Sequence, residues 1–200
     1  MAMDLTLTNI FQFISAISPL LLTFFMVMIS IFNQDLKGVV YLAGILITTI
    51  LNLVLLNIIG SEKSLQASSS CSLINLPFNL SKFNNPSLNS VIIAFTLIYL
   101  FMPMKYNNQF NYPVIAFVLS IFLLDAFSKV IFKCTTISGV LIGLLTGVFF
   151  GGLWYSLFHA MGYDSLLYFN TSSDKVYCSK PQKQAFKCSV YKNGELVKTL

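Results

Sequence analysis

The residues of this chain that could do chemistry lie at the ends of its apolar runs. They are mostly lysines, hydroxyls and amides, and they form four groups: Lys63 and Ser64; Pro86, Ser87 and Asn89; Ser128 and Lys129; Lys133, Thr135 and Thr136. Ammonium groups, hydroxyls and the free N–H groups at the start of a helix bind phosphate and other anions. If these ends meet, we expect an anion pocket; ordinary residues at a membrane surface are the alternative.

One carboxylate and one imidazole lie inside apolar runs. Asp125 precedes Lys129 by four residues, which is the favourable order for an ion pair on a helix. An acidic group inside a membrane is costly unless it is paired, so the alternatives are a structural pair and a functional charge. His159, the only histidine, lies beside Trp154 and Tyr155, as in an aromatic belt. With one histidine, we expect no catalytic residues, no metal and no cofactor.

These groups belong to a chain that is too apolar for a soluble domain. Of its 200 residues, 56% are hydrophobic and 10% are charged, whereas soluble domains carry about 25% charged residues. The mean hydropathy is +0.78. We therefore expect an all-α polytopic membrane protein. The net charge of +5 does not indicate a nucleic-acid partner, because half of the basic residues lie in one C-terminal tail.

We expect a bundle of about five transmembrane helices over residues 1–162. The predicted spans are 9–32, 39–59, 90–104, 113–132 and 137–160. The third run has roughly 15 residues, against the roughly 20 that a membrane span needs. We expect this span to tilt, to begin as early as Pro86, or to lie in a thinned part of the bilayer.

The last span carries a glycine at every fourth position. These glycines are Gly139, Gly143, Gly147 and Gly151. On a helix this spacing keeps them on one stripe, and small residues allow a second helix to approach closely. We therefore predict a helix-packing face, around which the rest of the bundle is arranged.

Five spans put the two ends of the chain on opposite sides of the membrane. The side of the tail would carry eight lysines and the other side four. Cytoplasmic loops carry an excess of lysine, so we expect the tail in the cytoplasm and the N-terminus outside. The glycosylation sequon at Asn79 would then lie outside, and the sequon at Asn170 inside.

The polar tail, residues 163–200, is expected to contain a β-hairpin. Residues 185–191 alternate and are rich in aromatic and branched side chains, and Asn193-Gly194 favours a tight turn. Residues 195–200 can then pair back. Cys178 and Cys188 could bridge across this sheet or remain free thiols in a reducing cytoplasm. A zinc site is not expected, since too few ligands are present.

Three segments resemble the type 2 phosphatidic acid phosphatases, especially the small dolichyl-diphosphatase-like members. The segments are LNLVLLNIIGSEKS, NNPSLNS and SKVIFKCTTISGVLIGLLTG. That family has a lysine six residues ahead of Arg-Pro, then Pro-Ser-Gly-His, then Ser-Arg, five residues, His, three residues and Asp. The resemblance covers roughly residues 50–158 and implies that the fifth span borders spans two, three and four.

The same resemblance implies that the catalytic groups are replaced. The nucleophilic histidine of the family falls on Thr135, the aspartate that orients it on Gly139, and the second histidine on Asn89. The two arginines fall on Lys63 and Lys129. Threonine without a neighbouring base is a weak nucleophile, and asparagine cannot shuttle a proton. We therefore expect the familiar phosphohistidine chemistry to be absent.

These observations favour a non-catalytic integral membrane protein with a structural or scaffolding role. The tail sequence CSKPQKQAFKCSVYKNGELV is similar to tails on membrane proteins of large DNA viruses. It would place the protein in a virion inner membrane, with residues 163–200 on a capsid layer or another membrane protein. The alternatives are an atypical lipid phosphatase and a protein that binds membrane lipids through their phosphates. The residual lipid-phosphate pocket would consist of Lys63, Ser87, Asn89, Ser128, Lys129 and Thr135.

Overall fold

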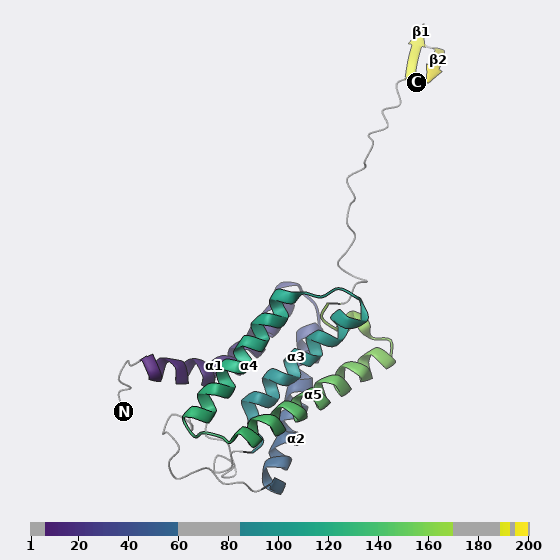
Figure 1. The fold of residues 1–200 in the computed structure, drawn as a ribbon. Helices are drawn as coiled ribbons and strands as arrows, with labels where there is room; N and C mark the ends of the chain where they lie inside the picture. Colours follow the sequence, from purple (N-terminus) through teal and green to yellow (C-terminus); the bar gives the residue numbers. More distant parts are fainter. Residues whose placement is uncertain (1–6, 60–84, 170–188, 193–194, 200) are drawn as a thin grey trace.

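The computed structural model describes residues 7–59, 85–169, 189–192 and 195–199 of the chain (Figure 1). Its elements are α1 (Leu7–Phe32), α2 (Lys37–Ile59), α3 (Leu88–Tyr106), α4 (Tyr112–Ile131), α5 (Ile137–Ala160), the short 3-10 helix η3 (Asp164–Leu166), β1 (Ser189–Lys192) and β2 (Glu195–Thr199). Five of these helices are long and apolar enough to cross a membrane. The expected all-α polytopic membrane fold is thereby confirmed.

The helices follow the hydropathy of the sequence closely. Their ends differ from the predicted spans by at most two residues, and the largest gain is in the third span. Helix α3 begins two residues after Pro86, runs through Pro103 and reaches 19 residues, close to the usual length of a span. The short apolar run therefore underestimates the length of α3, because the helix also includes Leu88 and Asn89 at its start and Lys105 and Tyr106 at its end.

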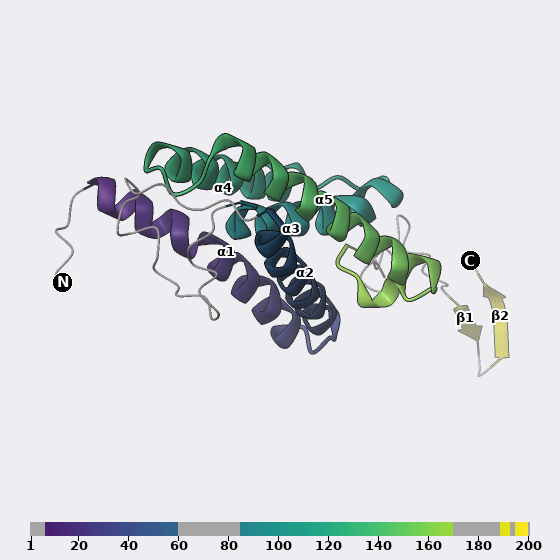
Figure 2. The ribbon, with the colours of Figure 1, turned by 90° about the horizontal axis from the view of Figure 1, so that it is seen from below.

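Helix α3, and not the glycine-rich α5, is the centre of the bundle. It contacts all four other long helices, and 56% of its apolar window is buried, compared with 17–33% in the others. Figure 2 shows α3 between α4 and α5 on one side and α1 and α2 on the other. The prediction that the bundle is arranged around α5 is wrong. The glycines of α5 allow another helix to approach closely on one face of α5 only, whereas α3 is contacted by helices on all sides.

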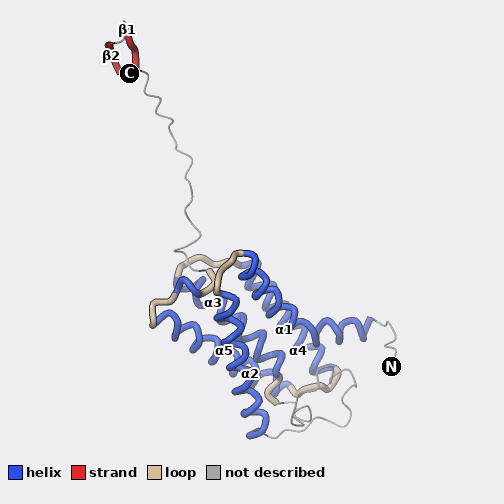
Figure 3. Tube along the Cα trace, turned by 180° about the vertical axis from the view of Figure 1, so that it is seen from behind, coloured by secondary structure: helices blue, strands red, loops and turns tan. Residues whose placement is uncertain are grey.

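The connections place two sets of loops at opposite ends of the bundle (Figure 3). At one end lie the start of α3 and the turn between α4 and α5. At the other end lie the turns after α1 and α3 and the segment that follows α5. Here the Tyr168 hydroxyl donates a hydrogen bond of 2.6 Å to the Met26 carbonyl, and the Asn107 amide donates one of 3.0 Å to the Phe169 carbonyl.

An aromatic cluster forms the core near that second end. Tyr41, Phe95 and Tyr99 are fully buried. The rings of Phe95 and Tyr99 stack with centroids 5.8 Å apart, and Tyr168 meets Tyr99 edge to face. The Tyr41 hydroxyl hydrogen-bonds that of Thr96 at 2.7 Å, which satisfies both groups inside an apolar bundle.

The tail contains the expected hairpin. Strands β1 and β2 pair antiparallel, with an irregularity between Val190 and Tyr191. The turn dipeptide 193–194 and residues 185–188 lie outside the described residues, as do Cys178 and Cys188.

Candidate functional site

Three of the predicted polar residues, Ser87, Thr135 and Thr136, lie in one cluster where the chain enters α3 and α5. We call it the Asn85 cluster, and its members are Asn85, Ser87, Thr135, Thr136 and Gly139. The Asn85 side-chain oxygen accepts hydrogen bonds from Thr136 at 3.0 Å and Thr135 at 3.4 Å. The Ser87 N–H donates to the Gly139 carbonyl at 3.0 Å. The cluster therefore joins the turn before α3 to the first turn of α5.

Thr136 gives this turn its local structure. Its backbone is extended, and its hydroxyl accepts a hydrogen bond of 3.2 Å from the Gly139 N–H, as an N-cap residue does. The hydroxyl thus helps α5 to begin at Ile137. Thr135 is 6% exposed, so its hydroxyl faces the protein interior.

Gly139 lies directly against the Asn85 side chain. A Cβ atom built at Gly139 would collide with the Asn85 amide oxygen and the Thr135 hydroxyl. The position that the resemblance gives to an orienting aspartate therefore has no room for a side chain here. Asn85 occupies that space and supplies the hydrogen-bonding group itself.

The second group is the Asp125 cluster, formed by Ser15, Asn89, Asp125 and Lys129. Asp125 is fully buried. Its Oδ1 accepts from the Ser15 hydroxyl at 2.9 Å and from the Asn89 amide at 3.0 Å, and Lys129 Nζ lies 3.9 Å away. Asn89 also donates to the Ser15 carbonyl at 3.2 Å. Three helices, α1, α3 and α4, are thus held together at one carboxylate.

The predicted lipid-phosphate residues are divided between these clusters. Asn89 turns toward α1 and α4, whereas Thr135 bonds to Asn85. Ser87 is buried in the Asn85 cluster, and Ser128 lies half-buried on α4 one residue before Lys129. Lys63 lies outside the described residues. The expected meeting of Asn89 and Thr135 at one point is not seen in their hydrogen bonds. The Asn89 amide bonds to Asp125 on α4, whereas the Thr135 hydroxyl bonds to Asn85 in the turn before α3.

The glycine stripe of α5 lies along α3. Gly139, Gly143, Gly147 and Gly151 are all buried. Added Cβ atoms would lie 2.9 Å from the Ser87 carbonyl at Gly143 and 2.8 Å from the Phe95 carbonyl at Gly151. Such distances are too short for a real side chain, so the two backbones approach each other closely.

Helix α5 has a second neighbour in α2. The Trp154 indole N–H donates to the Val40 carbonyl at 3.2 Å, and the indole lies over Gly44, where an added Cβ would be 2.6 Å from its nitrogen. Helix α4 packs along α1 and α3 instead. The fifth span therefore borders spans two and three as expected, but it is not packed along the fourth.

Several buried polar atoms have no hydrogen-bond partner among the described residues. They are Gln12 Oε1, both amide atoms of Asn52, the hydroxyls of Ser87, Ser90 and Tyr99, and Asp125 Oδ2. Ser15, Asn52 and Asn85 were not among the predicted site residues. A signal existed for Asn52: Gly44, Thr48 and Asn52 are spaced four apart, which places them on one small, polar stripe of α2, and all three are buried.

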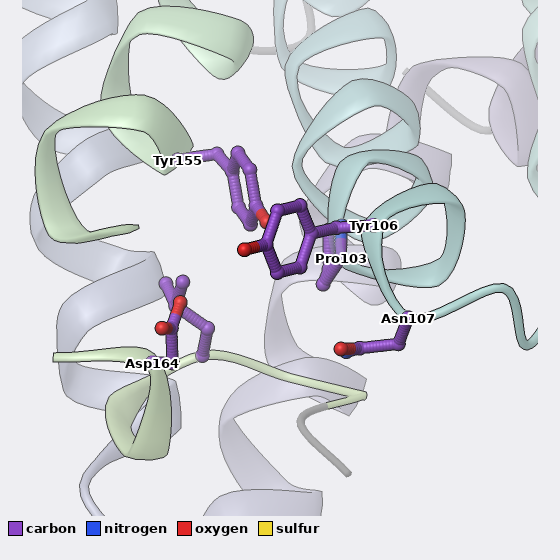
Figure 4. Close-up of a pocket in the computed structure, with 6 residues that line it drawn as sticks. Pro103, Tyr106, Asn107, Tyr155 and Asp164 are labelled. Atoms are coloured by element: carbon purple, nitrogen blue, oxygen red, sulfur yellow. The ribbon is translucent and has the colours of Figure 1, made fainter. Parts of the chain in front are cut away.

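A small cavity lies at the opposite end of the bundle (Figure 4). Its volume is about 40 Å³, and it is lined by Pro103, Tyr106, Asn107, Tyr155, Asp164 and Leu167. Figure 4 shows the Tyr106 and Tyr155 rings on one side and the Asp164 carboxylate on another. This volume holds a few water molecules at most, so a lipid headgroup does not fit inside.

His159 lies at the edge of this cavity and is held by its neighbours. Its Nδ1 is 2.7 Å from Asp164 Oδ1. Its ring stacks on that of Tyr155, with ring centroids 5.6 Å apart. It contacts the Tyr106 ring edge to face, with ring centroids 4.3 Å apart. The described residues that line the cavity include no serine, threonine or cysteine for this His–Asp pair to activate. The pair ties the end of α5 to η3.

No metal centre can be assembled from the described residues, which contain no group of three His, Cys, Asp or Glu side chains. Comparisons of the chain with protein-family models, with curated proteins and with solved structures found no match in any of the three. The likeness to lipid phosphatases therefore depends on the quoted motifs alone.

Proposed function

We propose that this is a non-catalytic integral membrane protein with a structural or scaffolding role, on a bundle that resembles the lipid phosphatases. One observation carries the proposal. The groups at the positions of the family's catalytic side chains are engaged in contacts within the bundle: Asn89 with Asp125 on α4, and Thr135 and Gly139 with Asn85 in the turn before α3. A hydrolase needs a nucleophile and a proton donor that face the substrate.

The scaffolding role assigns the docking to residues 163–200. This segment carries six lysines and a hairpin, and an isolated hairpin is only marginally stable in water. A protein partner would complete it. If the protein belongs to a virus particle, the bundle lies in the inner membrane of the particle and the tail contacts the capsid layer.

The absence of turnover can be tested directly. The purified protein in lipid vesicles is given a lysophosphatidate or an isoprenyl diphosphate, and released phosphate is measured. We expect no release above that of Thr135→Ala. Release by the natural chain that is lost in Thr135→Ala would overturn the non-catalytic assignment, because Thr135 would then act as a nucleophile.

The docking role is tested by replacing the tail. The full chain, a chain ending at residue 169 and a chain with residues 170–200 scrambled are compared for membrane insertion and for incorporation into particles, because residues 163–169 pack on the bundle. All three should insert, and only the full chain should be incorporated. Equal incorporation of all three would contradict the role. Incorporation of the scrambled chain would show that charge alone suffices.

A second candidate function is the binding of a lipid phosphate without turnover. It is favoured by the Ser87 hydroxyl, which is buried without a partner in the turn that touches the first turn of α5. Ser87→Ala combined with Lys63→Ala should remove a co-purifying anionic lipid, measured by mass spectrometry. The matched control is Lys105→Ala at the opposite end. Unchanged lipid content would contradict this candidate.

A further inference from the structure

We infer that the cavity between the ends of α3 and α5 binds a primary ammonium group, carried by the ethanolamine headgroup of a phospholipid or by a small free amine. This cavity lies at the end of the bundle opposite the Asn85 cluster. The inference concerns a site that the scaffolding role leaves unused, and it does not depend on that role.

The cavity carries negative charge and no cation of its own. Among the described residues that line it, the carboxylate of Asp164 is the one charged group, and 41% of this side chain is exposed. Helices α3 and α5 both end beside the cavity, and the C-terminus of a helix carries about half a negative charge. Lys105 is exposed and does not line the cavity. The cavity should therefore attract a cation.

The Asp164 carboxylate has one oxygen left for a ligand. Its Oδ1 lies 2.7 Å from His159 Nδ1, and Oδ2 accepts no hydrogen bond from the described residues. Figure 4 shows the hydroxyls of Tyr106 and Tyr155 and the Asp164 carboxylate around one space. All three groups can accept a hydrogen bond, and a primary ammonium has three N–H donors and no acceptor. The polar groups of the cavity therefore match this cation.

Two tyrosine rings complete the site. The faces of tyrosine rings attract cations, and both Tyr106 and Tyr155 line the cavity. The His159 ring contacts both of them, so the pair is held in place from one side. Tyr106 is 65% exposed, which leaves its ring accessible to a ligand from the membrane surface.

The size of the cavity favours a primary over a quaternary ammonium. Its volume of about 40 Å³ holds a few water molecules at most. A primary ammonium has one heavy atom, as water does, and can enter while the rest of its molecule stays outside. The nitrogen of choline carries three methyl groups and no N–H. It needs more room, and it cannot donate a hydrogen bond to Asp164. The cavity should therefore distinguish ethanolamine from choline.

The position of the cavity allows a lipid headgroup to reach it. Tyr106 and Ala160 are the last residues of two candidate spans, so the cavity lies where these helices leave the membrane. Tyrosine is enriched at this level, beside the headgroups. The ammonium of phosphatidylethanolamine is found at the same depth, and a free amine arrives from the water.

The first test compares ethanolamine with choline on the full natural chain, in two arms. In one arm the chain lies in bilayers of phosphatidylcholine, and binding of free ethanolamine or free choline is measured by saturation-transfer NMR. In the other, it is extracted from bilayers with equal amounts of phosphatidylethanolamine and phosphatidylcholine, and the retained lipids are identified by native mass spectrometry. We expect a preference for ethanolamine of about tenfold or more, the worth of a hydrogen bond to a charged group.

The two arms also identify the source of the ammonium. A preference in the lipid arm assigns the site to a headgroup, and a preference in the free-amine arm alone assigns it to a soluble amine. Either result supports the site. Equal binding of ethanolamine and choline in both arms, or binding of neither, would overturn it.

The second test uses variants of the lining residues in the same two arms. Asp164→Asn removes the charge and keeps an oxygen beside His159, and it should abolish the preference. Tyr106→Leu should weaken ethanolamine binding about two- to fivefold, as expected for one cation–π contact at an exposed site. The matched control is Tyr112→Leu, which removes a 72% exposed tyrosine outside the cavity at the same end of the bundle. An unchanged preference in Asp164→Asn, or an equal loss in Tyr112→Leu and Tyr106→Leu, would overturn the site.

Discussion

The two sides of α3 are held by opposite means. Toward α5, the contact is between backbones, and the glycine stripe supplies no side chain at all. Toward α1 and α4, the contact is a buried carboxylate with hydrogen-bond donors from two other helices and a lysine on its own helix. Lipid tails are as apolar as leucine, so apolar burial alone does not select a partner helix. The first side should therefore be sensitive to added volume, and the second to the loss of a charge partner.

The largest effect is expected from breaking the ion pair. Lys129→Met leaves the Asp125 carboxylate fully buried without its cation, and removal of one member of a buried pair costs about 3 kcal/mol or more. The free energy of unfolding, measured by titration with a denaturing detergent, should fall by that amount.

The double variant tests whether the charge is the cause. Asp125→Asn combined with Lys129→Met removes both charges and keeps an oxygen that accepts from Ser15 and Asn89. We expect it to recover most of the lost stability. A double variant as unstable as Lys129→Met would show that lysine packing, and not charge pairing, holds this side of α3.

A smaller effect is expected on the glycine side. A Cβ at Gly147 would lie 2.7 Å from Ala94 Cβ and 2.9 Å from the Phe95 nitrogen, so Gly147→Ala should cost about 1–3 kcal/mol. Gly152, next to the stripe, has Met102 Cε at 3.7 Å as its nearest contact. Gly152→Ala should be neutral or stabilising by up to about 1 kcal/mol, because alanine is the better helix former.

The same unfolding titration compares the two glycine variants. Equal effects of Gly147→Ala and Gly152→Ala would contradict close backbone packing as the basis of the contact between α3 and α5. A loss of stability in Gly147→Ala alone would show that this side of α3 is damaged by added atoms. In the Asp125 cluster, by contrast, the damaging change is the removal of a charged group.

The smallest effect concerns Tyr168, which combines ring packing on α3 with one hydrogen bond. Tyr168→Phe removes the bond to the Met26 carbonyl and should cost about 1 kcal/mol at neutral pH. Burial, aided by the charge of Asp35, raises the pKa of Tyr168 to about 12, from about 10 when unfolded. The neutral phenol therefore stabilises the fold below pH 10, and this stabilisation is lost as the pH rises through 12.

The melting temperature of both proteins between pH 8 and pH 12 checks this prediction. The advantage of the natural chain over Tyr168→Phe should shrink as the pH rises from 10 to 12. A constant difference across this range would show that the pKa of Tyr168 is the same in the folded and the unfolded chain.

The helices could be predicted from the sequence because each depends on its own residues. Twenty or so apolar residues make a span whatever their neighbours are, and the ends agree within two residues. The spacing from Asp125 to Lys129 predicted an ion pair, and the pair is present on α4. The stripe of glycines was equally visible, since spacing on a single helix is a local property.

The site could be predicted only in part. The sequence identified Asn89 and Thr135 as polar residues at helix ends, but not the direction of their side chains. Asn89 turns toward Asp125 because a buried carboxylate needs donors from other helices. Asn85 was not among the predicted residues, because an asparagine before Pro-Ser is typical of an ordinary loop. Its role depends on its contact with Gly139, which only the tertiary structure shows.

The sequence by itself thus determined the membrane class, the five spans, the glycine stripe and the charge pair, because hydropathy and helical spacing are local. Only the tertiary structure decided that α3 is the centre, that the stripe faces α3, and that the polar residues divide into the Asn85 and Asp125 clusters. These choices depend on which surfaces fit one another across helices that are far apart in the chain. In a bilayer, apolar residues alone do not favour one fit over another, so glycines and buried polar groups make the choice.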